Sequence, residues 1–177
     1  MSKKRIATVW LDGCSGCHMS FLDMDERLLE VAAAADVVYS PLVDVKEFPE
    51  DVDVTLVEGA VSSEEDLRKI KIVRARTRIL VSLGDCAVTS NVPGMRNPFG
   101  TKAVYDRAYR ENVTFDPGIP NQVVPALLPN SRPVHEFVNV DVFVPGCPPS
   151  ADTIYYVVTE LLEGHKPDLN QQTRFGS

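Results

Sequence analysis

The sequence predicts a single α/β domain built around a parallel β-sheet. Short runs rich in β-branched and aromatic residues alternate with stretches whose apolar residues recur at helical spacing, which is typical of successive strand–helix–strand units. The length of 177 residues suits one domain, and apolar residues make up 44% of the chain, enough for a buried core. We therefore expect residues 1–177 to form one α/β domain.

The first expected elements lie in the N-terminal third of the chain. Residues 6–11 form a strand, and a helix from about 19 to 35 follows a glycine-containing turn. Residues 36–39 form a short second strand, and residues 53–57 form a third strand that ends at a Glu-Gly pair. This order starts the alternation that a parallel sheet requires.

A well-marked helix and a fourth strand follow. Two serines at 62–63 precede a run of acidic residues, which is a helix-start signature. The helix should end near Arg76, because its last turn is basic, as the helix dipole prefers. Residues 78–83 form the fourth strand, which ends at a Gly-Asp-Cys sequence.

The fifth strand and the last helix come near the C-terminus. Residues 140–144 form the strand, which a Pro-Gly-Cys-Pro-Pro sequence ends. A helix from about 150 to 163 stops at Gly164, a natural C-cap, and a polar tail begins near 168.

Between the fourth and fifth strands lies a long irregular insertion, from about 91 to 139. It holds most of the prolines and one expected helix, 102–111. Loops this long in compact domains are usually functional or interaction elements. The apolar stretch 123–128 within it is either surface that awaits a partner or a cover for the sheet.

Composition and charge exclude several classes of protein. The net charge is −7 and the isoelectric point is near 4.9, which argues against a nucleic-acid binder. No run approaches the roughly 18 apolar residues of a membrane span, and the N-terminus lacks an export signal. We expect a cytoplasmic protein with no membrane span and no nucleic-acid partner.

The four cysteines each follow the end of an expected strand. Cys14 and Cys17 come after the first strand, Cys86 after the fourth and Cys147 after the fifth. The carboxyl ends of parallel strands meet at one edge of the sheet, where open α/β folds bind their ligands. We therefore expect the four thiols to form one cluster in space.

Several chemistries use converging thiols. A disulfide framework is disfavoured because nothing indicates export. Structural zinc usually takes two close pairs of ligands, and here only Cys14 and Cys17 are close in sequence. A thioredoxin-like dithiol would leave Cys86 and Cys147 without a role. A four-iron cubane uses four cysteines, and the Cys147-Pro148 pair is typical of its ligands, so the residues favour iron–sulfur.

Four motifs together resemble the small subunits of nickel–iron hydrogenases. They are Cys14-Ser15-Gly16-Cys17, Glu58-Gly59, Gly84-Asp85-Cys86-Ala87 and Pro145-Gly146-Cys147-Pro148-Pro149. The wider runs 7–21 and 84–97 are similar to the small subunit of the cytoplasmic NAD-reducing (bidirectional) hydrogenases. The resemblance covers the chain from Ile6 to about Glu163.

The resemblance implies a flavodoxin-like parallel sheet with helices on both faces. It also implies one [4Fe-4S] cluster whose ligands match the family's motifs, namely Cys14, Cys17, Cys86 and Cys147. No cysteine follows Cys147, so the further clusters of longer relatives have no ligands in this sequence. The cluster would relay electrons from the nickel–iron centre of a separate large subunit, through iron–sulfur subunits, to FMN and NAD on a diaphorase module.

The sequence leaves two alternative assignments open. The cluster-bearing subunit of respiratory complex I typically has two adjacent cysteines, whereas Ser15 and Gly16 separate them here. A zinc-stabilised structural protein is the alternative from another class. A flavin on this chain is disfavoured, because the cluster would occupy the loop 12–17 that flavodoxins use for the FMN phosphate.

Some residues near the expected site have two interpretations. Glu58 either acts beside the cluster or satisfies loop amides, and the resemblance favours the first. His18 either bonds a cluster sulfur or is an ordinary partly buried histidine. Trp10 is expected to pack in the core, and Arg96 and Asn97 either contact a partner or lie in a solvated loop. The chain itself is expected to supply no catalytic residue.

Overall fold

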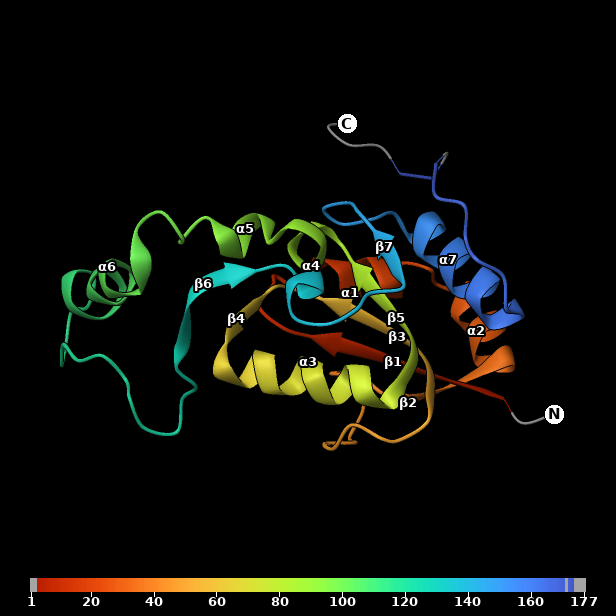
Figure 1. Ribbon diagram of the computed structural model, residues 1–177, viewed down its shortest axis with the longest axis horizontal. Coiled ribbons are helices and arrows are strands. Elements are labelled where there is room, and N and C mark those ends of the chain that lie inside the picture. Colours follow the sequence, from red (N-terminus) through yellow and green to blue (C-terminus); the bar gives the residue numbers. More distant parts are fainter. Residues whose placement is uncertain (1–2, 171, 174–177) are drawn as a thin grey trace.

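A computed structural model describes residues 3–170 and 172–173 of the chain (Figure 1). Its main sheet has five strands in the order β2-β1-β3-β5-β7, and every neighbouring pair is parallel. The strands are β1 (Lys4–Trp10), β2 (Ala35–Tyr39), β3 (Val52–Glu58), β5 (Thr77–Leu83) and β7 (Val142–Val144). This is the flavodoxin-like strand order, so the predicted fold class is confirmed.

Helices cover both faces of the sheet. One face carries α1 (Gly16–Leu22), α2 (Arg27–Ala34) and α7 (Ala151–Glu163), and the other carries α3 (Glu64–Arg76). Two separate apolar clusters result because alternate strand residues point to opposite faces. Val54 and Leu56 of β3 belong to the cluster under α7, whereas Val57 belongs to the cluster under α3.

Local sequence signals fix the ends of the two long helices. Ser63 caps α3 and forms a reciprocal capping box with Asp66, as the serine pair and the following acids predict. Ser150 caps α7 through the backbone N–H of Thr153, and Gly164 ends that helix in the left-handed conformation. Both helices lie where the sequence places them.

The single helix expected over 19–35 is wrong, because the structure has two helices there. Between α1 and α2 the chain turns so that Met24 is buried, with 1% of its surface exposed. Asp25 takes a positive φ of 51°, which aspartate tolerates better than most residues. The apolar spacing continues across the turn, so periodicity alone could not locate it.

The insertion 91–139 has more regular structure than one helix. The helix expected over 102–111 is confirmed as α6 (Gly100–Asp106), continued by a π-helical turn η1 (Arg107–Glu111). The insertion also contains α5 (Asn91–Gly94), a 3₁₀ turn η2 (Val134–Glu136) and β6 (Leu127–Arg132). Before it, α4 (Asp85–Thr89) follows β5, and β4 (Val61–Ser63) pairs antiparallel with β6. The two ends of the apolar stretch 123–128 differ. Leu127 and Leu128 belong to β6, whereas Val123 is fully exposed at the surface.

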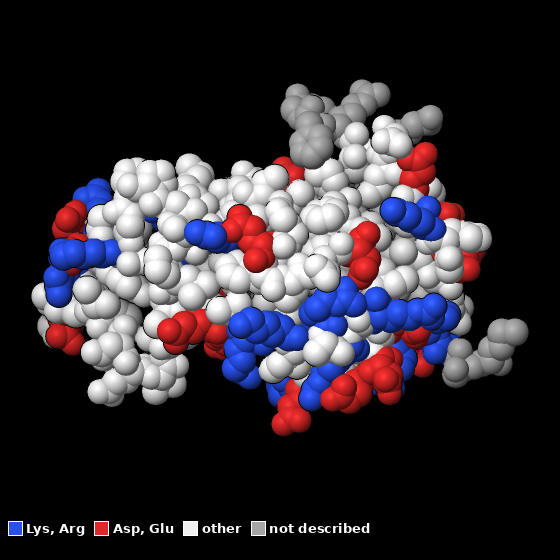
Figure 2. All heavy atoms as spheres, in the orientation of Figure 1, with Lys and Arg blue, Asp and Glu red and all other residues white. Residues whose placement is uncertain are grey.

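Charge is unevenly spread over the surface. Lys and Arg side chains collect over α3 and the neighbouring amino ends of the strands (Figure 2). The described part of the predicted polar tail packs back on the domain, where Leu169 contacts the cluster under α7. Within the described residues, the helices are too short or too polar to cross a membrane.

Packing under α3 can be tested with Ile70, a fully buried residue of that helix. We expect Ile70→Ala to lower the free energy of unfolding by about 2–5 kcal/mol, because a cavity would remain between α3 and the sheet. Leu29→Ala is the matched control, since Leu29 is 72% exposed on α2 and should cost less than about 0.5 kcal/mol. Urea denaturation measures the free energy of unfolding of both variants, and equal losses of stability would contradict the packing of Ile70 against the sheet.

Candidate metal centre

The cysteine-bearing loops follow three strands at the same edge of the sheet. Cys14 and Cys17 follow β1, Cys86 lies in the first turn of α4 directly after β5, and Cys147 follows β7. In the sheet order β1 and β5 flank β3, and β7 lies next to β5, so the three loops lie along one edge of the sheet. The sequence argument that parallel strands bring the cysteines to one edge therefore agrees with the structure.

Gly84 shows how closely the loops approach. It has a φ of 81°, and a Cβ at this position would overlap the Cys17 sulfur. The same Cβ would lie 3.5 Å from the carbonyl oxygen of Gly146. Cys17 therefore packs directly against the turn after β5, and that turn also lies against the loop after β7.

Hydrogen bonds join the loops after β5 and β7. The Gly84 N–H donates to Val144 O at 2.8 Å, and the Asp85 N–H donates to Gly146 O at 2.8 Å. The Asp85 carboxylate accepts from the Gly146 N–H at 2.7 Å. These bonds fix the spacing between Cys86 and Cys147 without involving either thiol.

The first cysteine loop is held to β3 in the same manner. The Leu11 N–H donates to Glu58 O at 2.9 Å, and Asp12 and Ala60 exchange two backbone hydrogen bonds. Gly59 makes this approach possible, because its φ is 95° and a Cβ there would lie 2.9 Å from the Asp12 nitrogen. The Glu58-Gly59 pair, which the sequence analysis identified, therefore holds the first cysteine loop against the end of β3.

Glu58 and His18 form a buried pair below this loop, with 2% and 4% of their surfaces exposed. One carboxylate oxygen of Glu58 accepts from the His18 backbone N–H at 3.0 Å and also contacts His18 Nδ1. Among the described residues, His18 Nε2 has no hydrogen-bond partner although it is buried. Both predicted residues therefore lie next to Cys17, and one ring nitrogen stays unsatisfied.

The thiols influence one another electrostatically. Burial raises the pKa of the Cys17 thiol well above its ordinary value, and the Glu58 carboxylate and the other three thiols raise it further. Burial also raises the pKa of Cys86, against the opposing effect of the Val92 backbone N–H. Four thiolates at this edge therefore need positive charge nearby, which iron or zinc would supply.

The donor set fits a metal group. The four thiols are free, and they range from the buried Cys17 to the exposed Cys14 and Cys147. The group therefore opens toward the surface at one side while its other side rests on the rigid sheet. Four cysteine sulfurs are the donor set of a [4Fe-4S] cluster. No three of them lie within 4.8 Å of one another, which is wider than the four ligands of one tetrahedral zinc ion would be.

Three further residues have roles that the sequence did not define. The expectation that Trp10 packs in the core is wrong, because its side chain is 44% exposed and its indole N–H donates to Gly13 O at 3.1 Å. It lies at the last position of β1, where burial of the strand ends. Arg96 and Asn97 bind within the chain, to Leu128 O and to the Ser131 backbone.

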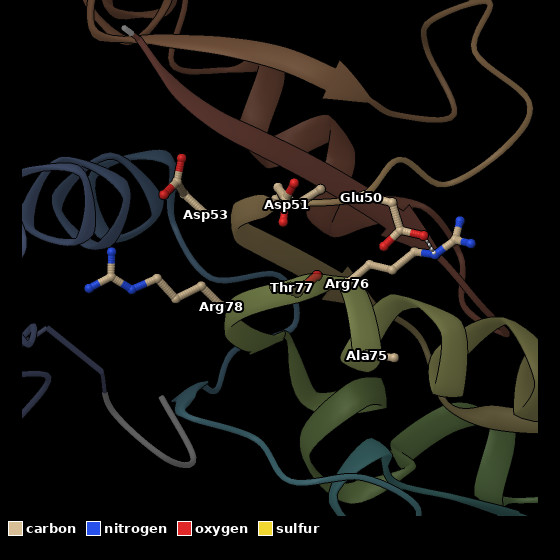
Figure 3. A pocket seen from close by; sticks show the side chains of 8 residues that line it. Glu50, Asp51, Asp53, Ala75, Arg76, Thr77 and Arg78 are labelled. Carbon is tan, nitrogen blue, oxygen red and sulfur yellow. Dashed lines mark ion pairs between the residues drawn. The ribbon is translucent and has the colours of Figure 1, made fainter. Parts of the chain in front are cut away.

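The opposite edge of the sheet has a different character. A cavity of about 380 Å³ opens there at the amino ends of β3 and β5, and charged side chains line it (Figure 3). Arg76 pairs with Glu50 at 2.8 Å, and Asp53 accepts from the Arg5 backbone N–H. This cavity contains no cysteine and takes no part in the thiol cluster.

Comparisons with known proteins agree on one family. The family of the NADH ubiquinone oxidoreductase 20 Kd subunit matches residues 14–161. The NAD-reducing hydrogenase HoxS subunit delta of Cupriavidus necator is 42% identical over 172 residues, which cover 94% of this chain and 82% of the relative. The Sulfhydrogenase 2 subunit delta of Pyrococcus furiosus is 30% identical over 157 residues, but the match covers only 61% of that protein.

Solved structures give the same result. The crystal structure of an NAD+-reducing [NiFe]-hydrogenase in the H2-reduced state contains a chain with a TM-score of 0.93 and 39% identity, and the match covers 98% of this chain and 99% of that one. A [NiFeSe]-hydrogenase from Dm. baculatum has a TM-score of 0.59 at 17% identity, which shows a shared fold alone. The predicted resemblance is confirmed: the chain belongs to the family of the NADH ubiquinone oxidoreductase 20 Kd subunit, and within it to the small subunits of NAD-reducing [NiFe] hydrogenases.

Proposed function

We propose that Cys14, Cys17, Cys86 and Cys147 hold one [4Fe-4S] cluster, through which this subunit passes electrons between its large subunit and a flavin- and NAD-binding module. The convergence of four free thiols at one sheet edge carries this proposal. Such a cluster supplies one-electron transfer when bound. The large subunit would hold the nickel–iron centre, and FMN and NAD would bind to diaphorase subunits in the cytoplasm.

The chain's own contribution is to position and shield the group. Hydrogen bonds hold the loops after β5 and β7 to each other and the loop after β1 to the end of β3, so that the thiols need little rearrangement to bind a metal group. The buried Cys17 excludes water on the inner side, while the exposed Cys14 and Cys147 face outward toward a partner. Burial and local charge are the means by which a protein sets the potential of a bound cluster.

Metal content separates this proposal from a zinc site and identifies the ligands. Anaerobically purified protein should be brown and hold about four irons per chain. Cys86→Ser and Cys147→Ser should each lose most of this iron, whereas Met19→Leu, at an exposed position near Cys17, should keep it. Iron analysis and visible absorption measure this, and colourless protein with stoichiometric zinc would refute the cluster.

The close approach at Gly84 makes a second prediction. Gly84→Ala should prevent iron binding, because its methyl group would occupy the position of the Cys17 sulfur. Gly164→Ala is the matched control, since Gly164 also has a positive φ, of 87°, but open space around it. The control should lose only about 1–2 kcal/mol of stability and keep its iron. Full iron content in Gly84→Ala would show that the two loops are not in contact.

We further propose that Glu58 and His18 position Cys17 and act on the cluster through charge. Glu58 is a buried carboxylate beside a thiol ligand, and its negative charge already raises the pKa of Cys17. The same charge should disfavour the more negative, reduced state of the cluster. The His18 ring adds a buried nitrogen without a partner among the described residues, which a sulfur of the bound group would satisfy.

Two substitutions of Glu58 separate these roles. Glu58→Ala should lower the iron content, because His18 and the start of α1 lose their anchor. Glu58→Gln keeps an oxygen acceptor but loses the charge, so the iron should stay and the reduction potential should rise. Glu30→Gln, on the exposed surface of α2, is the control. An EPR-monitored redox titration measures the potential, and no change in a fully loaded Glu58→Gln would limit Glu58 to a structural role.

A further inference from the structure

Ser20 is a buried polar residue of α1 that forms a hydrogen bond with a distant part of the chain. Its surface is 5% exposed, and its hydroxyl donates to Pro149 O at 2.6 Å. The two residues are 129 positions apart in the sequence. The bond therefore joins the helix that carries Cys17 to the loop that carries Cys147.

The loop after β7 has few backbone groups that can anchor it. Three of the five residues in its Pro-Gly-Cys-Pro-Pro sequence are prolines, which lack a backbone N–H. On the side before Cys147, Gly146 exchanges hydrogen bonds with Asp85. On the side after Cys147, the bond from Ser20 to Pro149 O holds the loop. The exposed thiol ligand therefore lies between two anchors.

The carbonyl of the buried Pro149 needs this donor, because α7 does not supply one. Ser150 is the N-cap of α7, and its own carbonyl accepts the first helical N–H, from Ile154 at 3.0 Å. The preceding N–H, of Thr153, donates to the Ser150 hydroxyl at 3.1 Å. Removal of the Ser20 hydroxyl would therefore take away the hydrogen bond of a buried carbonyl, which is costly.

Ser20 and Cys17 lie on the same face of α1, because they are three residues apart in the helix. Pro149 lies close to the same place. A Cβ at Gly84 would overlap the Cys17 sulfur, and it would also lie 3.7 Å from Cδ of Pro149. The inner thiol, the turn after β5 and the loop after β7 therefore meet near the bond from Ser20 to Pro149.

We infer that Ser20 is a positioning residue for Cys147, on which it acts through Pro149. It keeps that exposed thiol close to the buried Cys17. This rests on the proposed function, in which both cysteines are ligands of one [4Fe-4S] cluster. Cys17 is held by its helix, whereas Cys147 depends on the two anchors of its loop. Without the Ser20 anchor the Cys147 sulfur can move away from the bound group, so the cluster loses iron more easily.

The test measures how fast iron leaves the full chain. Wild type and variants are purified anaerobically, an iron(II) chelator is added, and the visible absorption of the cluster is followed. We expect Ser20→Ala to lose iron about tenfold faster than wild type, because Pro149 O loses its donor. Ser40→Ala is the matched control, since Ser40 is also 5% exposed and its hydroxyl accepts from the Thr8 hydroxyl of β1 at 2.9 Å. The control should lose iron at the wild-type rate.

Two further measurements separate positioning of the ligand from a general loss of stability. Ser20→Thr keeps the hydroxyl and should restore slow iron release, and the EPR spectrum of the reduced cluster should change in Ser20→Ala alone. Iron release at the wild-type rate with an unchanged spectrum in Ser20→Ala would overturn the inference and leave the proposed cluster intact. Equally fast release from Ser20→Thr or from Ser40→Ala would overturn it in the same way. A wild-type chain that holds no iron would refute the proposed cluster, and the inference with it.

Discussion

The parallel pairing of β1, β3, β5 and β7 is the constraint on which the rest of the site depends. It brings loops that are distant in the sequence to one edge of the sheet. Hydrogen bonds from Gly84 to Val144 and between Asp85 and Gly146 then hold the loops after β5 and β7 together. The resulting group of thiols is unfavourable in its ionised form, because burial and mutual repulsion raise the pKa of Cys17. The fold therefore supplies the rigidity, and a positively charged group would favour the ionised form of the thiols.

Glu58 both holds the first cysteine loop in place and acts on the Cys17 thiol through its charge. A carboxylate with 2% exposure is costly to bury, and its hydrogen bonds to His18 offset part of that cost. The same bonds fasten the start of α1, and hence Cys17, to the end of β3. Its negative charge also raises the pKa of that thiol. Glu58 therefore stabilises the loop and, at the same time, disfavours further negative charge at the site. A neutral residue could provide the first effect but not the second.

Much of the fold and the main site could be predicted because both depend on local signals. Strand periodicity, the Ser63 cap and Gly164 located most of the elements, and the position of each cysteine after a strand end placed the four thiols at one edge of the sheet. The break between α1 and α2 could not be predicted, because Met24 keeps the apolar spacing while the chain turns around it. Nor could the pairing of β4 with β6, which is short and joins segments far apart in the sequence. The exposure of Trp10 depends on where the sheet ends, which only the three-dimensional structure defines.

The two edges of the sheet differ in a way that determines how the molecule can face a partner. At the amino ends of the strands, charges are paired with one another, as Arg76 is with Glu50, and an apolar partner would gain little there. At the carboxyl ends, the loops that carry the thiols are bordered by exposed apolar side chains, namely Trp10, Met19 and Val92. Net charge could not reveal this difference, because a total of −7 averages over both edges. The sheet thus gathers the cysteines at the edge with exposed apolar side chains and leaves the paired charges at the other edge.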